Sequence, residues 1–416
     1  MTAPLFHTLF LAALAVSLCL RLFLAQRQIA HVRAHRNAVP AAFASSIPLA
    51  THQHAADYTI AKMRLSMASS LFDALLLLVL TLGGGLQYLW QTSALAGLEA
   101  LGQGLVFVAL TTLLSALAGL PFTLISTFGI EAHYGFNKIT PRLFMSDLLR
   151  STLLSVLLGL PLLALVLWLM QGAGTLWWLW VWLVWAGFSL ILLLVYPTFI
   201  APLFNRFQPL DDKVLAARID QLLSRTGFKS QGIFVMDGSR RSSHGNAYFT
   251  GFGAAKRIVF FDTLLGTLSH AEVEAVLAHE LGHFKKKHVA KRMATTFALA
   301  LGFLFILGQC LTNFWFYQGL GLSSQSHAIA LVLFFMVMPL FTFPLTPLSS
   351  LLSRKHEYEA DAFAAGETAA SDLISALAKL YRDNASTLTP DPLYSAFYDS
   401  HPPAALRIAH LKGLPA

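Results

Sequence analysis

Residues 275–288 read AVLAHELGHFKKKH and contain two histidines four positions apart, with a glutamate directly after the first. In a helix, positions i and i+4 share one face, so His279 and His283 can reach the same cation. Glu280 projects to the side, where it can take a proton from a water that the metal polarises. At this chain's His and Glu frequencies, H-E-x-x-H arises by chance about 0.01 times per chain. A metal site therefore explains the motif better than surface histidines on a helix.

A catalytic zinc site has three protein ligands and leaves the fourth position to water. The candidate third ligand lies in SRKHEYEADAFAAG, residues 353–366, where Glu357 and Asp361 are one helical turn apart. One carboxylate can bind the metal, and the other can accept the N–H of a ligating imidazole. His356 and Glu359 point to other faces and are expected to be solvated. Taken alone, this stretch could also be a charged helix beside the membrane.

The elements that must position these residues are short. Ser269-His270-Ala271-Glu272 is a capping box and predicts that the motif helix starts at Ser269. Upstream, residues 211–225 have apolar side chains at helical spacing. Three short runs typical of strands follow, at 232–237, 246–249 and 257–262, and the glycine-bearing GFGAAK separates the last two. The motif is thus expected in a small α+β part.

The rest of the chain is typical of a membrane protein. Of its 416 residues, 56% are hydrophobic and 12% charged, and the mean hydropathy is +0.62; a soluble domain averages about 25% charged residues. The net charge of +8 fits basic loops that face anionic lipid better than a nucleic-acid partner. No Lys or Arg precedes the first apolar run, which favours a retained span over a signal peptide. Seven runs are long enough to span a bilayer: 4–24, 69–90, 102–126, 151–171, 175–203, 293–317 and 328–350.

The loops predict the orientation. Basic loops after the first and third spans alternate with nearly uncharged ones, so the positive-inside rule places the N-terminus outside. The fold class is therefore an α-helical multi-pass membrane protein with about seven transmembrane helices and a small cytoplasmic metalloprotease part. We expect four segments: spans 1–5 over 1–203, a cytoplasmic catalytic segment over 204–292, spans 6–7 over 293–350, and a cytoplasmic segment with the third ligand over 351–416.

Together these motifs resemble the integral-membrane zinc endopeptidases known as CAAX prenyl proteases, which also have seven spans. Most of residues 120–410 resemble the family, whereas the first 120 match mainly in span pattern. HtpX-type membrane quality-control proteases share H-E-x-x-H and E-x-x-x-D but have fewer spans. The matching stretches are EAHYGFNKITPRLF (131–144), YPTFIAPLFNRFQPL (196–210), DGSRRSSHGNAYFTGF (237–252), RIVFFDTLL (257–265), HELGH, HEYEAD and HPPAALRI (401–408).

The resemblance implies a role for each matching residue. One zinc ion per chain would be held by His279, His283 and Glu357, with Glu280 as general base. Asp361 would support a ligand from behind. The substrate backbone would be held by Asn246, Ala247 and Tyr248, and the carbonyl that is attacked would lie under His401 and Arg407. The family usually has glutamate just before that arginine, whereas this chain has Leu406, so Arg407 is expected to be loosely held.

The expected activity is zinc-dependent hydrolysis of a peptide bond in a peptide or protein substrate at the bilayer. The resemblance implies a prenylated C-a-a-X tail as substrate. An alternative is quality control of membrane proteins with no prenyl group. A bacterial cytoplasmic membrane is favoured as location, or the endoplasmic reticulum in a eukaryote. Two alternatives from other classes are a metal transporter, which would need ionisable residues within the spans, and a non-catalytic zinc-binding scaffold, which would not need Glu280.

Overall fold

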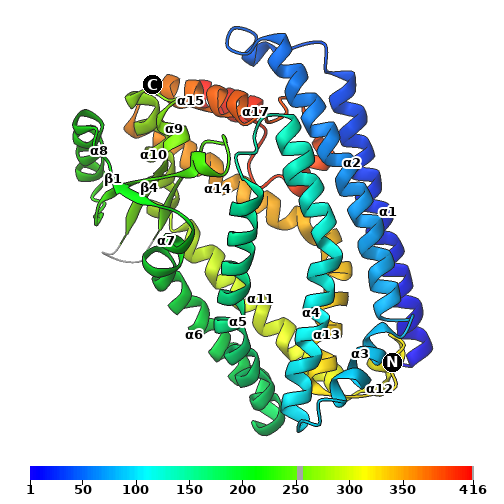
Figure 1. Cartoon of the computed structure of the whole chain (residues 1–416). Helices are drawn as coiled ribbons and strands as arrows, with labels where there is room; N and C mark the ends of the chain where they lie inside the picture. Colours follow the sequence, from blue (N-terminus) through cyan, green and yellow to red (C-terminus); the bar gives the residue numbers. More distant parts are fainter. Residues whose placement is uncertain (251–255, 415–416) are drawn as a thin grey trace.

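The computed structural model describes residues 1–250 and 256–414 (Figure 1). Within these residues, seven helical segments are long and apolar enough to cross a membrane, which confirms the predicted number. The segments run over Ala3–Ala34 (α1), Leu49–Leu80 (α2), Ala100–Glu131 (α4, Ala100–Leu124, with a π-helical end), Pro141–Gly172 (α5), Gly174–Phe204 (α6, Trp177–Val195, and α7, Ala201–Phe204), His288–Leu311 (α11) and His327–Glu367 (α13, His327–Thr342, and α14, Thr346–Glu367).

The second span differs most from its predicted range of 69–90. Helix α2 begins at Leu49 and ends at Leu80, where Thr81 leaves the helical conformation. Gly84, with a φ of +79°, then turns the chain into the next short helix. Asp73 therefore lies about two helical turns before the C-terminal end of α2. It lines a cavity of about 340 Å³ together with Arg21 of α1, so the spans do carry ionisable groups.

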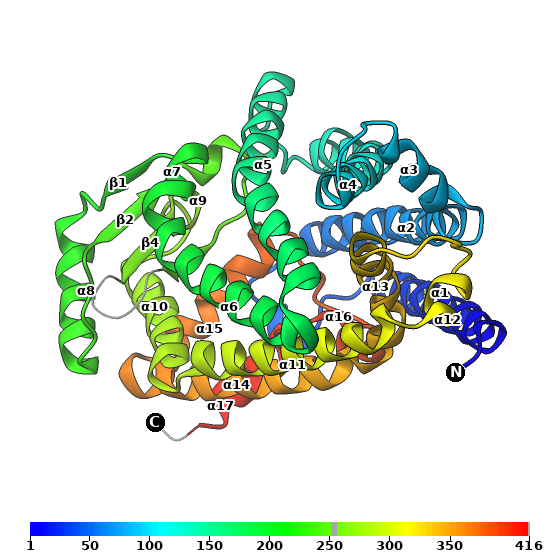
Figure 2. The same cartoon turned by 90° about the horizontal axis from the view of Figure 1, so that it is seen from below.

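The spanning helices pack closely at the end of the bundle that is remote from the sheet. Two short helices, α3 (Gly85–Ala94) and α12 (Phe314–Gln318), lie at this end (Figures 1 and 2). Large side chains from five elements are buried together there: Phe10, Phe107, Leu307, Tyr317 and Ile329. Aromatic and aliphatic burial of this kind fixes the helices at one end.

The opposite end carries a four-stranded sheet in the order β1-β2-β4-β3. The strands are β1 (Phe207–Pro209), β2 (Ile233–Met236), β3 (Ala247–Thr250) and β4 (Arg257–Phe261). Strands β2 and β4 are parallel, and both outer strands pair antiparallel to their neighbours. Strand β3 therefore lies at an edge. The predicted GFGAAK turn between β3 and β4 falls largely on 251–255, outside the described residues.

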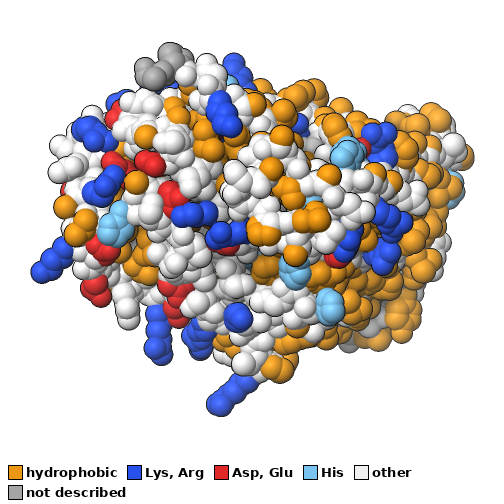
Figure 3. Space-filling view, turned by 90° about the horizontal axis from the view of Figure 1, so that it is seen from above, with side chains coloured by type: hydrophobic (Ala, Val, Ile, Leu, Met, Phe, Trp, Pro, Cys, Tyr) orange, Lys and Arg blue, Asp and Glu red, His pale blue; other side chains and the backbone are white. Residues whose placement is uncertain are grey.

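Helices surround this sheet and bring the motif helix against the last span. Helix α10 (His270–Lys285) starts after Ser269, whose capping box with Glu272 is present as predicted. Its apolar face packs against α8 (Lys213–Thr226), α9 (Asp262–Leu265) and α15 (Ala370–Asp383). Helix α14 continues the last span into the same packing, and the short helices α16 (Pro392–Tyr398) and α17 (Ala404–Lys412) complete this part. Figure 3 shows Lys and Arg side chains gathered on this end of the molecule.

Candidate metal centre

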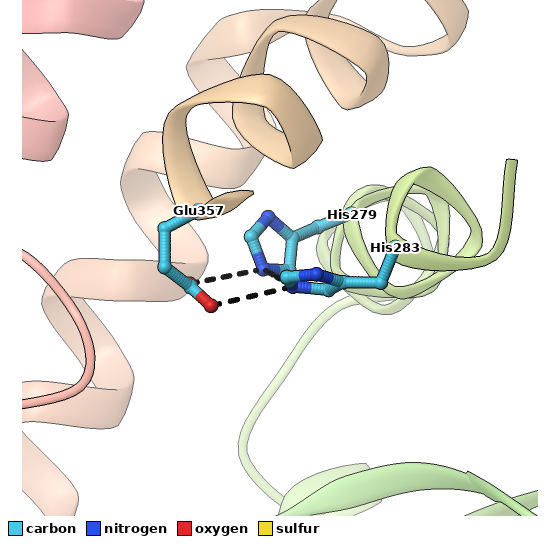
Figure 4. Close-up of side chains that lie close together, drawn as sticks. All are labelled: His279, His283 and Glu357. Carbon is cyan, nitrogen blue, oxygen red and sulfur yellow. Dashed lines mark hydrogen bonds and ion pairs between the residues drawn. The ribbon is translucent and has the colours of Figure 1, made fainter. Parts of the chain in front are cut away.

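Three side chains from two helices point toward one another at the contact between α10 and α14 (Figure 4). Nε2 of His279 lies 3.2 Å from Nε2 of His283. The carboxylate of Glu357 lies 3.4 Å from the first of these nitrogens and 3.3 Å from the second. All three ligand atoms fall within 4.8 Å of one another. The close approach of the helices depends on Gly282, where a Cβ would lie 2.9 Å from the Cα of Ala360.

The donor set fits a zinc ion. Two atoms that each lie 2.0–2.2 Å from a tetrahedral ion are roughly 3.4 Å apart, which matches the separations between these ligand atoms. Two imidazole nitrogens and one carboxylate oxygen are also a common ligand set of catalytic zinc. In addition, Oε2 of Glu357 is buried, and no group of the described residues donates a hydrogen bond to it. A buried carboxylate oxygen without a partner is costly, and a bound cation would satisfy it.

The far side of the His279 ring is held by a buried ion pair. Its Nδ1 lies 2.8 Å from Oδ1 of Asp361, and Arg407 donates two hydrogen bonds to the same carboxylate, at 2.8 and 2.5 Å. Burial alone would lower the pKa of His279, but the nearby carboxylates of Asp361 and Glu357 outweigh it and raise the pKa to about 9. The expectation that Leu406 leaves Arg407 loosely held is wrong, because Asp361 supplies the carboxylate from another helix.

The far side of the His283 ring is held by His288, for which the sequence predicted no role. Its Nδ1 lies 3.0 Å from Nδ1 of His288, and Nε2 of His288 lies 2.9 Å from Oε2 of Glu359. The ring of His356 stacks on His288 with centroids 4.0 Å apart. Glu359 and His356 are thus engaged and not simply solvated. The only signal in the sequence was the third histidine of HELGHFKKKH.

Glu280 and His401 border the three ligands without belonging to them. Burial raises the pKa of the Glu280 carboxyl above its usual range, against the opposing charges of His279 and His283. Nε2 of His401 lies 3.5 Å from Oε1 of Glu357, and its side chain is 60% exposed. One largely buried carboxyl and one exposed imidazole thus lie beside the three candidate ligands.

The three predicted substrate-binding residues lie on or next to the edge strand β3. Asn246 is exposed, and its side-chain Oδ1 accepts the N–H of Ala247 at 2.8 Å. Tyr248 lies on the sheet face opposite to Ala247 and Phe249, which pack on the core, and its ring is 6.2 Å from that of Phe261. The side chain of Tyr248 is therefore structural in this arrangement. Among the described residues, no other strand pairs with the outer edge of β3, although the N–H of Ala247 is already bonded to Asn246.

Comparisons with known proteins agree with this architecture. Residues 28–206 match the family described as CAAX prenyl protease N-terminal, five membrane helices, and residues 209–414 match peptidase family M48. CAAX prenyl protease 1 homolog of Arabidopsis thaliana is 40% identical over 74% of this chain and 73% of its own. The mouse homolog is 34% identical over 94% and 92% of the two chains. The crystal structure of S. mikatae Ste24p superposes with a TM-score of 0.90 at 31% identity and covers 98% of both chains.

Proposed function

The chain belongs to the CAAX prenyl protease family of M48 membrane metalloendopeptidases, and we propose that it hydrolyses a peptide bond near the C-terminus of prenylated C-a-a-X proteins. The observation that carries this proposal is the meeting of His279, His283 and Glu357 beside Glu280. A prenylated tail is anchored in the bilayer, which suits a site built at the end of a membrane bundle.

We assign one zinc ion per chain to His279, His283 and Glu357. When bound, zinc acts as a Lewis acid that polarises the scissile carbonyl and makes the attacking water more acidic. Asp361 fixes the ring orientation of His279 through its Nδ1, and this leaves Nε2 free as the ligand atom.

The chain's own residues handle the protons. Glu280 takes a proton from the water as its oxygen attacks the carbonyl carbon, and it later passes a proton to the leaving nitrogen. Its raised pKa suits this role, because a base works best with a pKa near the operating pH. His401 is accessible beside Glu357 and can donate a hydrogen bond to the oxygen on which negative charge develops. Arg407 lies 3.7 Å from Glu357 but is buried on Asp361, so we assign it to positioning.

The substrate backbone is proposed to add to the free edge of β3, beside Asn246 and Ala247. The catalytic end is proposed to face the cytoplasm, because Lys and Arg gather there (Figure 3). Proteins that carry a C-a-a-X tail would reach the site from that side.

A peptide-cleavage assay in detergent tests the proposal. Farnesylated and unmodified C-a-a-X peptides are compared with a misfolded membrane protein as substrates. We expect the farnesylated peptide to be cleaved fastest by the zinc-loaded enzyme. The Glu280→Gln variant should bind zinc but not cleave, since an amide cannot accept the proton. Preference for the misfolded protein would favour quality control, and an active Glu280→Gln variant would contradict the mechanism.

A further inference from the structure

The segment that leads into the edge strand β3 is fixed by side chains from three other elements. The ring of His244 stacks on that of Phe136, with centroids 4.5 Å apart and an angle of 14°, and its carbonyl accepts the hydroxyl of Thr263 at 3.0 Å. Asn384, at the end of α15, holds the next residue. Its Oδ1 accepts the N–H of Gly245 at 3.0 Å, and its Nδ2 donates to the carbonyl of Gly245 at 3.4 Å.

The bonds between Asn384 and Gly245 lie on the side of the strand that faces away from β4. The carbonyl of Asn246 accepts an N–H from β4 at 3.0 Å, so Asn246 and Tyr248 direct their backbone groups toward β4. In an antiparallel pair the direction alternates from one residue to the next. The backbone groups of Gly245, Ala247 and Phe249 therefore face away from β4. Of these three, Asn384 occupies both backbone groups of Gly245, and Oδ1 of Asn246 accepts the N–H of Ala247 at 2.8 Å. Within the described residues, the carbonyl of Ala247 is therefore the first group along this side that a peptide can use.

The amide of Asn384 offers Gly245 one donor and one acceptor, as a residue of a neighbouring strand would. We propose that Asn384 is a register stop: it closes the edge of β3 at Gly245, so that a bound peptide pairs with β3 no further than the carbonyl of Ala247. This inference rests on the proposed function, because it assumes that the substrate adds to β3. It assigns Asn384 a role in choosing which peptide bond is cleaved.

A stop is needed because strand pairing alone does not specify register well. A slip of two residues keeps every side chain on the same face and restores the same hydrogen-bond pattern. Along an open edge, a peptide could therefore present bonds two residues apart to the metal ligands. Asn384 removes this option at one end of the edge.

The stop is also rigid. The backbone N–H of Asn384 bonds the carbonyl of Leu380 at 3.0 Å. The next residue, Ala385, is buried against Tyr58 and Phe136 with a φ of +44°. Nδ1 of His244 lies 3.3 Å from Oδ1 of Asn384, which helps to fix the amide orientation.

The test is the identity of the cleaved bond, measured by mass spectrometry on a farnesylated C-a-a-X peptide and on the same peptide extended by two residues. We expect wild type to yield one product from each peptide. Asn384→Ala should yield an additional product whose cleavage site is displaced by two residues, with zinc content unchanged. Asn384→Asp keeps the size of the side chain and an acceptor for the N–H of Gly245, so it should keep the single site.

A merely structural role for Asn384 would slow cleavage without moving the site, and that result in folded, zinc-loaded Asn384→Ala overturns the proposal. A second measurement uses the wild-type enzyme and does not depend on a variant that folds. A photoreactive residue is moved along the peptide, and it should crosslink to Asn384 from a single position. Crosslinks from positions two residues apart would contradict a stop. Failure of the proposed function has a different signature, because wild type would then cleave neither peptide. Failure of the register stop alone leaves wild-type cleavage intact.

Discussion

The two histidines proposed as zinc ligands are equivalent in the sequence motif but not in the folded protein. The ring of His279 is backed by Asp361 and Arg407, a charged pair buried between α14 and α17. The ring of His283 is backed by His288, which meets a glutamate whose side chain is 32% exposed. A buried ion pair must be complete to be tolerated, whereas the second arrangement reaches solvent. We conclude that the His279 side is structural as well as functional, and that the His283 side mainly adjusts the metal site.

The largest effect is expected from breaking the buried pair. Asp361→Asn or Arg407→Met should destabilise the protein by about 3–5 kcal/mol, because each removes one charge of a buried ion pair and leaves the other without its main partner. Zinc content should fall as well, since His279 loses its support. Arg240→Met, which changes an exposed arginine, is the matched control. Thermal unfolding in detergent and elemental analysis measure both properties. A stable, zinc-loaded Arg407→Met variant would contradict the proposed difference between the residues behind His279 and those behind His283.

The next largest effect should come from His401, on the exposed side of the site, and should change activity but not zinc content or stability. His401→Ala removes a donor from the side that substrate approaches, and loss of such a donor lowers kcat by about 10²–10³-fold. Because the side chain is 60% exposed, we expect zinc content and thermal stability to stay at wild-type values. Steady-state kinetics beside elemental analysis measure this. Unchanged kcat would leave His401 with no more than a role in starting α17.

A smaller effect is expected on the His283 side. His288→Phe keeps the ring volume but removes the contact with His283, and loss of such a supporting partner lowers metal affinity by about 10–100-fold. Glu359→Gln should weaken binding less, because its side chain is partly exposed. Competition with a zinc chelator gives the affinities. His356→Phe preserves stacking on His288 and serves as the control. If His288→Phe destabilises the fold as strongly as Arg407→Met, the asymmetry is not real.

Features that depend on neighbouring residues could be predicted from the sequence, whereas the contacts behind the two histidines could not. The H-E-x-x-H spacing and the capping box at Ser269 are local patterns, and both lie on the predicted helix. The apolar spans are local patterns as well, and their number was predicted correctly. The Asp361–Arg407 pair joins residues 46 positions apart, and His288 meets Glu359 across 71 positions. Nothing in either segment alone specifies its partner. The second span was misplaced for a related reason, since the polar first half of α2 is held in a helix by tertiary packing rather than by hydrophobicity.

The smallest effect is expected at the start of α10, the helix that carries both His279 and His283. The carboxylate of Glu272 accepts the N–H of Ser269 and the ammonium of Lys379, both at 2.7 Å, and the hydroxyl of Ser375 at 2.6 Å. Glu272→Gln keeps the shape but removes the charge, and should destabilise the protein by about 1–2 kcal/mol at neutral pH. Because His279 and His283 both lie on α10, the relative effects of Arg407→Met and His288→Phe should not change in this background.

The pH dependence identifies the charge as the cause. Burial would raise the pKa of Glu272, but its bonds to Lys379, Ser375 and Ser269 outweigh this and lower the pKa. A carboxyl whose pKa is lowered by folding contributes its full stabilisation above the ordinary value of about 4.3, and loses it as pH falls through the lowered pKa. The difference in melting temperature between wild type and Glu272→Gln should therefore be constant near neutral pH and shrink below pH of about 4. A difference that stays the same down to acid pH would assign the effect to packing and not to the carboxylate's charge.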